Sequence, residues 1–212
     1  MSEPYAVDGL PFDPIPAGRA ILVVGSGIDG ARLVQSRLLV GPPEEGILVV
    51  AADRGVESAV ESLQEVDPEL DDDRIVAVGC AGESNQTGGV RTRSVSTPTD
   101  LTGIGIRFSE GHRDLEAAGY DRVRSGIASL TTLVSTATDL RPIYRFLHSF
   151  TGQVRSQKGL LVCAIDDATV DDEVFRTIES TFDARIEVEG GDERRVRLRG
   201  LAGQRDDWVA LD

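Results

Sequence analysis

Ile21-Leu22-Val23-Val24-Gly25-Ser26-Gly27-Ile28-Asp29-Gly30-Ala31-Arg32 is the stretch that decides the fold. Its apolar run predicts a buried strand, its glycines a tight turn, and the residues after them the start of a helix. This run spans 20–24, and similar apolar runs follow at 47–51, 75–78, 123–127 and 160–165. Stretches with helical periodicity separate them. This alternation predicts an α/β fold with a mostly parallel twisted sheet flanked by helices.

The helical stretches have apolar residues three or four positions apart, which places them on one face of each helix. We expect helices around residues 56–63, 101–115, 143–154 and 175–182. Residues 185–189 and 195–199 alternate with period two on either side of a glycine turn, which predicts a C-terminal antiparallel β-hairpin. The segment after it, from Trp208, could add a final edge strand. Residues 81–98 have no periodicity and are expected to form a surface loop.

The domain organisation follows from length and composition. The chain has 212 residues, 40% of them hydrophobic, which suits one sizeable core. Residues 1–18 contain four prolines and are predicted to be an extended lead-in. Residues 19–212 then form a single domain.

Charge is the strongest compositional signal. The chain has 36 acidic and 22 basic residues, giving a formal net charge of −14, and Lys158 is the one lysine. Such acidity with so little lysine resembles the proteins of haloarchaea, whose carboxylate-rich surfaces stay hydrated in molar salt. At that salt the Debye length falls to about 3 Å, so self-repulsion is screened. We therefore expect a halophilic protein.

Several functional classes are disfavoured by the same composition. No apolar run approaches the ~20 residues of a membrane span, and the N-terminus lacks the pattern of a secretory signal, so we expect a cytoplasmic protein with no membrane partner. The acidic surface should repel phosphate backbones, which argues against nucleic acid as a partner. Cys80 and Cys163 lie within apolar runs without neighbouring ligands, so no metal site is predicted.

The glycine turn has two competing interpretations. Gly25, Gly27 and Gly30 match G-x-G-x-x-G, and Asp53 follows the second strand, as in a dinucleotide-binding fold where an acid binds ribose. Alternatively, Gly25 to Gly30 is the glycine frame of a P-loop. The Lys and Ser/Thr that should follow it are replaced by Ala31 and Arg32. A purely structural turn is a third option.

Further segments resemble a haloarchaeal group within the RecA/KaiC-like P-loop ATPase superfamily. They are residues 100–106, 120–133, 142–148 and the tail from Arg195 to Trp208. The resemblance covers roughly residues 10–210 and favours the P-loop interpretation of the turn. It implies a RecA-like fold with a C-terminal hairpin.

The resemblance also implies that the chemistry has been lost. The family's P-loop Lys corresponds to Ala31, its Ser or Thr to Arg32, and its magnesium-binding Asp to Ala128. Asp53 stands where a general base is often found and would be a vestigial base. Residues Gly25, Ser26, Gly27, Ile28, Asp29, Gly30, Ala31 and Arg32 would form a vestigial phosphate loop.

These losses predict a non-catalytic, pseudo-ATPase regulatory or protein-interaction module. No cofactor is expected, and ATP or ADP would bind weakly at most. Its expected partners are other RecA/KaiC-like subunits or further copies of itself. The alternatives are enzymes: an ATPase using Arg32 in place of the P-loop Lys, or an NAD-binding oxidoreductase using Gly25, Gly27 and Gly30 with Asp53.

Overall fold

The computed structural model describes residues 2–25, 27–80, 88–190, 193–204 and 206–211. The strands are β1 (Arg19–Gly25), β2 (Glu45–Ala51), β3 (Ile75–Gly79), β4 (Arg91–Ser94), β5 (Arg122–Ile127), β6 (Leu160–Asp166), β7 (Ala184–Glu189), β8 (Arg195–Arg199) and β9 (Val209–Ala210). The helices are α1 (Ile28–Leu39), α2 (Gly55–Gln64), α3 (Leu101–Ala117), α4 (Leu130–Ser135), α5 (Leu140–Ser156) and α6 (Asp172–Glu179), with short 3₁₀ turns at Asp72–Arg74 and Asp167–Thr169.

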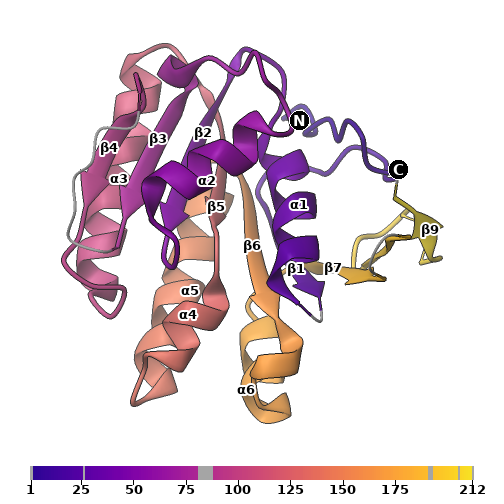
Figure 1. Ribbon diagram of the computed structural model, residues 1–212. Helices are drawn as coiled ribbons and strands as arrows, with labels where there is room; N and C mark the ends of the chain where they lie inside the picture. Colours follow the sequence, from indigo (N-terminus) through magenta and orange to yellow (C-terminus); the bar gives the residue numbers. More distant parts are fainter. Residues whose placement is uncertain (1, 26, 81–87, 191–192, 205, 212) are drawn as a thin grey trace.

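The described strands form one sheet in the order β4-β3-β2-β5-β6-β1-β7-β8-β9. Every pairing from β4 to β7 is parallel, and the hairpin strand β8 and then β9 add antiparallel. The central strands are buried along their length because helices cover both faces (Figure 1). The α/β prediction, with its mostly parallel sheet and C-terminal hairpin, is confirmed.

Two helical layers sandwich the sheet. Alternate side chains of β1 point to opposite faces, so Ile21 and Val23 join one core cluster while Leu22 and Val24 join the other. The first cluster packs against α1 and α2, and the second against α3, α4, α5 and α6. Because the turn after β1 leads directly into α1, it lies at the edge of the α1–α2 layer.

The segment before β1 is part of the core. Tyr5 and Ile15 pair through backbone hydrogen bonds, and both are fully buried. Two arginines of β5 hold this segment. Arg122 donates to the carbonyls of Glu3 and Pro4, and Arg124 donates to the carbonyl of Ala6.

Two elements were missed by the sequence analysis. The predicted surface loop 81–98 is wrong for residues 91–94, which form the edge strand β4; residues 81–87 lie outside the described part of the chain. The short helix α4 was not predicted either. Within the described residues, no helix is both long and apolar enough to cross a bilayer.

Candidate functional site

The turn between β1 and α1 is short. β1 ends at Gly25 and α1 begins at Ile28, so only positions 26 and 27 separate strand from helix. Ser26 lies outside the described residues. Ile28, Asp29, Gly30, Ala31 and Arg32, which the sequence analysis assigned to the vestigial phosphate loop, all lie within the first two turns of α1.

Each glycine of this turn has a structural reason. Gly27 adopts φ 103°, a conformation that residues with a side chain rarely adopt. A Cβ on Gly30 would lie 3.3 Å from the Val188 side chain, so this glycine lets α1 pack closely on β7. A Cβ on Gly25 would lie 3.3 Å from the Gly27 carbonyl oxygen. The spacing of the glycines is therefore explained by packing and backbone geometry.

A protein carboxylate accepts a hydrogen bond from the start of α1. Asp166, the last residue of β6, is in register with Gly25. Its Oδ1 accepts hydrogen bonds from the backbone N–H groups of Gly27, at 3.2 Å, and Ala168, at 3.1 Å. Backbone N–H groups at the amino end of a helix attract anions. Here the anion is the carboxylate of Asp166, which belongs to the chain itself.

Arg32 and Asp53 form an ion pair at the edge of the α1–α2 layer. The guanidinium of Arg32 contacts the carboxylate of Asp53, and the two side chains are only 13% and 17% exposed. The side chain of Arg32 is therefore largely shielded from solvent. It also lies 3.4 Å from Asp29, whose same oxygen lies 3.3 Å from Arg54. Burial, reinforced by the charge of Arg54, lowers the pKa of Arg32.

Three sequence-predicted residues meet at one small cavity. Arg32, Asp53 and Ala128 line it together with buried side chains of α1 and α2. Its volume is about 20 Å³, close to the room one water molecule needs. A magnesium ion with its bound phosphates requires far more space. Arg32, Asp53 and Ala128 are thus brought together around almost no free volume, whereas Gly25 lines a separate hollow of about 260 Å³ beside β7 and β8.

Two buried polar groups near the cavity are satisfied internally. Gln35 of α1 donates from Nε2 to the carbonyls of Ile127 and Val162, both at 2.8 Å, and so ties α1 to β5 and β6. Ser129 caps α4 by accepting from the N–H of Thr132. Neither contact was predicted, because each depends on which strands lie side by side. Among the described residues, no group of three His, Cys, Asp or Glu side chains could hold a metal ion.

Strand order separates the two interpretations of the glycine motif. In dinucleotide-binding folds the strand carrying the ribose-binding acid lies next to the strand that precedes the glycines. Here β5 and β6 lie between β1 and β2. Among the described residues, Asp53 contacts α1 through the side chain of Arg32. The sheet therefore lacks the topology of the NAD-binding alternative.

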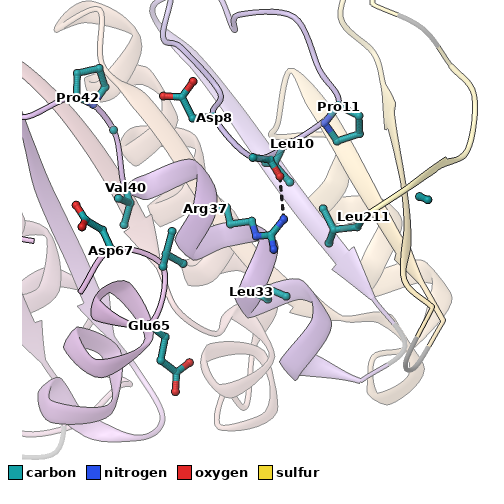
Figure 2. A pocket seen from close by; sticks show the side chains of 14 residues that line it. Asp8, Leu10, Pro11, Leu33, Arg37, Val40, Pro42, Glu65, Asp67 and Leu211 are labelled. Atoms are coloured by element: carbon teal, nitrogen blue, oxygen red, sulfur yellow. Dashed lines mark hydrogen bonds between the residues drawn. The ribbon is translucent and has the colours of Figure 1, made fainter. Parts of the chain in front are cut away.

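A larger hollow lies at the other end of α1. Figure 2 shows it between the N-terminal segment, the end of α1 and the C-terminal residues. Its volume is about 790 Å³. Arg37 donates to the carbonyl of Gly9 there, at 2.8 Å. Its lining mixes Leu33, Val40 and Leu211 with acidic side chains. Of the sequence-predicted site residues that the structure describes, none lines this hollow.

Comparisons with known proteins identify a family and a similar fold. The model of a family described as "Family of unknown function (DUF7504)" matches residues 18–188. No curated protein matches the chain. A solved structure, the KaiC-like protein PH0186 from the hyperthermophilic archaeon Pyrococcus horikoshii OT3, superposes with a TM-score of 0.67 at 12% identity, covering 99% of this chain and 94% of its own. The fold is therefore KaiC-like, of the RecA type.

Proposed function

The chain belongs to the family of unknown function DUF7504, and we propose that it is a non-catalytic, RecA-like regulatory module. In this role it is a pseudo-ATPase that acts by binding other proteins. Other RecA/KaiC-like subunits or further copies of itself are its proposed partners. The acidic composition supports the proposal that it works in the concentrated salt of a haloarchaeal cytoplasm.

The ion pair between Arg32 and Asp53 is the observation that carries the proposal. In an active P-loop protein, a Ser or Thr at position 32 would bind magnesium, and a carboxylate near Asp53 would act on the attacking water. Here the two side chains neutralise each other, and the cavity beside them measures about 20 Å³. A phosphate ligand would therefore have to compete with Asp53 for the guanidinium of Arg32.

The missing side chains add an energetic argument. Position 31, where a P-loop has its Lys, is an alanine buried in the core, and position 128 offers no carboxylate. Each lost charge-assisted contact removes roughly 1.5–3 kcal/mol. Three such losses amount to about 5–9 kcal/mol, comparable to the ~8 kcal/mol that defines a micromolar site. Tight binding of ATP is therefore not expected.

The alternative enzymes are less well supported. An ATPase that uses Arg32 as its phosphate ligand needs that guanidinium free, whereas Asp53 and Asp29 hold it. The NAD-binding alternative needs β1 and β2 side by side, whereas two strands separate them. Both alternatives therefore require a rearranged site.

Calorimetry in molar KCl tests the proposal. Titration of the full chain with MgATP, ADP and NAD should give no binding tighter than about 1 mM. Arg32→Met, which removes the cation that a substitute ATPase would need, should behave like the wild type, and neither should hydrolyse ATP. Hydrolysis by the wild type that disappears in Arg32→Met would overturn the proposal in favour of the ATPase. Tight binding of NAD would overturn it in favour of the oxidoreductase.

A further inference from the structure

A groove between α5 and α6 lies on the layer opposite the glycine turn. It has a volume of about 820 Å³, and its lining combines apolar Leu140, Tyr144 and Val174 with two arginines of α5 and, on the α6 side, the acidic Asp171 and Glu173. Tyr144 is 40% exposed and is one of two large hydrophobic side chains, with Ile106, that are exposed among the described residues. Gly152, further along the exposed face of α5, has nothing within 4 Å of where its Cβ would lie. Another helix could therefore come close to this exposed face of α5.

The exposed side of α5 carries an arginine stripe, defined here as Arg141 and Arg145. Both side chains are exposed, and neither forms an ion pair with any described residue. Residues 140–158 contain four basic residues and no acidic one, in a chain whose net charge is −14, and of the four Arg155 is paired with Asp183. Such local concentration of positive charge calls for a negatively charged partner surface.

A matching acidic stripe lies on α2, formed by Glu57 and Glu61. Both residues are exposed, and the part of the chain that is described offers no ion pair to either. Residues 55–73 contain eight acidic residues and no basic one. Each stripe places its charges four residues apart on a helix, a separation of about 6 Å along the axis. Two helices laid side by side can therefore pair both charges at once.

The two stripes cannot meet within one molecule. α2 packs on one face of the sheet and α5 on the other (Figure 1). We propose that the arginine stripe of α5 docks against the acidic stripe of α2 on a second copy of this chain. Tyr144 and the apolar groove beside it are then covered by the partner's helix. This inference rests on the proposed function, because it names the partner of the interaction module.

Because the contact joins two different surfaces, each molecule keeps one free surface of each kind. Head-to-tail contacts of this type build rings when the rotation closes and open chains when it does not. Ion pairs covered by an interface are screened less by salt than exposed ones, and the apolar groove adds contact that salt does not weaken. Association should therefore weaken in molar KCl without being abolished.

Charge reversal tests the contact in the full chain. Sedimentation velocity should show the wild type associating as its concentration rises. Arg141→Glu with Arg145→Glu should weaken association by about tenfold or more, because like charges then face each other. Glu57→Arg with Glu61→Arg should do the same. Combining all four substitutions in one chain restores complementarity and should restore association.

A matched control separates this contact from net charge. Arg113→Glu with Lys158→Glu makes the same change in net charge at two exposed positions outside both stripes and should leave association unchanged. A wild type that stays monomeric, a control that dissociates equally, or a fourfold variant that does not recover would overturn the inference. So would a monomeric wild type that binds a labelled single-stranded oligonucleotide through Arg141 and Arg145. None of these results concerns the binding of MgATP. The pseudo-ATPase proposal is therefore tested separately, by calorimetry.

Discussion

At the scale of single residues, Arg32 is held by a carboxylate of its own chain. Asp53 satisfies the charge of its guanidinium, and in the proposed pseudo-ATPase this pair takes the place of a magnesium-binding hydroxyl. A buried charge left without a partner is costly, so each side chain depends on the other. In the same way, the carboxylate of Asp166 satisfies the backbone N–H of Gly27 by accepting its hydrogen bond.

Removing the charge of Asp53 should therefore destabilise the protein. Asp53→Asn leaves Arg32, only 13% exposed, without its main counter-ion, and we expect a loss of about 1–3 kcal/mol in the free energy of unfolding. Asp29→Asn is the control, because Asp29 is 78% exposed and its loss should cost less than about 0.5 kcal/mol. Urea denaturation of both variants measures the difference. Equal losses would contradict a structural role for the buried pair.

The sequence predicted which residues would surround the site but not what they do to one another. The glycine spacing located the turn, and the family resemblance placed Arg32, Asp53 and Ala128 near it. The ion pair could not be foreseen, because it depends on α1 starting at Ile28, early enough to aim position 32 at the end of β2. Asp166 was missed because it depends on β6 lying beside β1.

At the scale of elements, a buried charge cluster joins the N-terminal segment to the sheet. Glu45 at the start of β2 accepts hydrogen bonds from Arg122, at 2.8 Å, and Arg124, at 2.5 Å. Arg124 is fully buried, and its remaining donors reach the carbonyls of Leu38 and Ala6. This cluster connects α1, β2, β5 and the first residues of the chain.

Neutralising Glu45 should loosen all of these elements. Glu45→Gln leaves Arg124 buried without a countercharge, and we expect a loss of about 3–5 kcal/mol in stability. The neighbouring Glu44 is exposed, so Glu44→Gln should change stability by less than about 0.5 kcal/mol. Thermal and urea unfolding of the two variants check this. A similar, small effect in both would show that the cluster contributes little.

The sequence predicted long, buried elements well because their apolar periodicity follows from burial. β4 lacked such a signal, since it is an edge strand with arginines that pair with α3: Arg93 lies 2.6 Å from Asp114 and 2.9 Å from Glu110. α4 spans only Leu130–Ser135, too short for a helical repeat to be recognised. Both elements are defined by their neighbours more than by their own residues.

At the scale of the whole molecule, charge is unevenly distributed. The net charge is −14, yet residues 140–158 carry none of the acidic residues. Clustered like charges repel one another in dilute salt and favour unfolding, because unfolding separates them. Added salt screens this repulsion, since the Debye length falls from about 10 Å at 0.1 M to about 3 Å at 1 M.

Stability should therefore rise with salt. Circular dichroism should give a higher melting temperature in about 2 M KCl than in about 0.1 M KCl, the direction set by the loss of self-repulsion. Scans at several protein concentrations separate this effect from self-association, which would make the melting temperature depend on concentration. Equal melting temperatures at the two salts would contradict the halophilic interpretation.

In the proposed pseudo-ATPase, the ion pair between Arg32 and Asp53 also bears on timing. An ATPase subunit changes conformation with each turnover. Its contacts with other subunits therefore depend on the supply of ATP and re-form once per cycle. A subunit in which a carboxylate of the chain itself neutralises Arg32 has no such cycle of binding and release. In an assembly with active ATPase subunits, it would stay in one conformation while its neighbours change theirs. It would then act as the rigid subunit relative to which the others move.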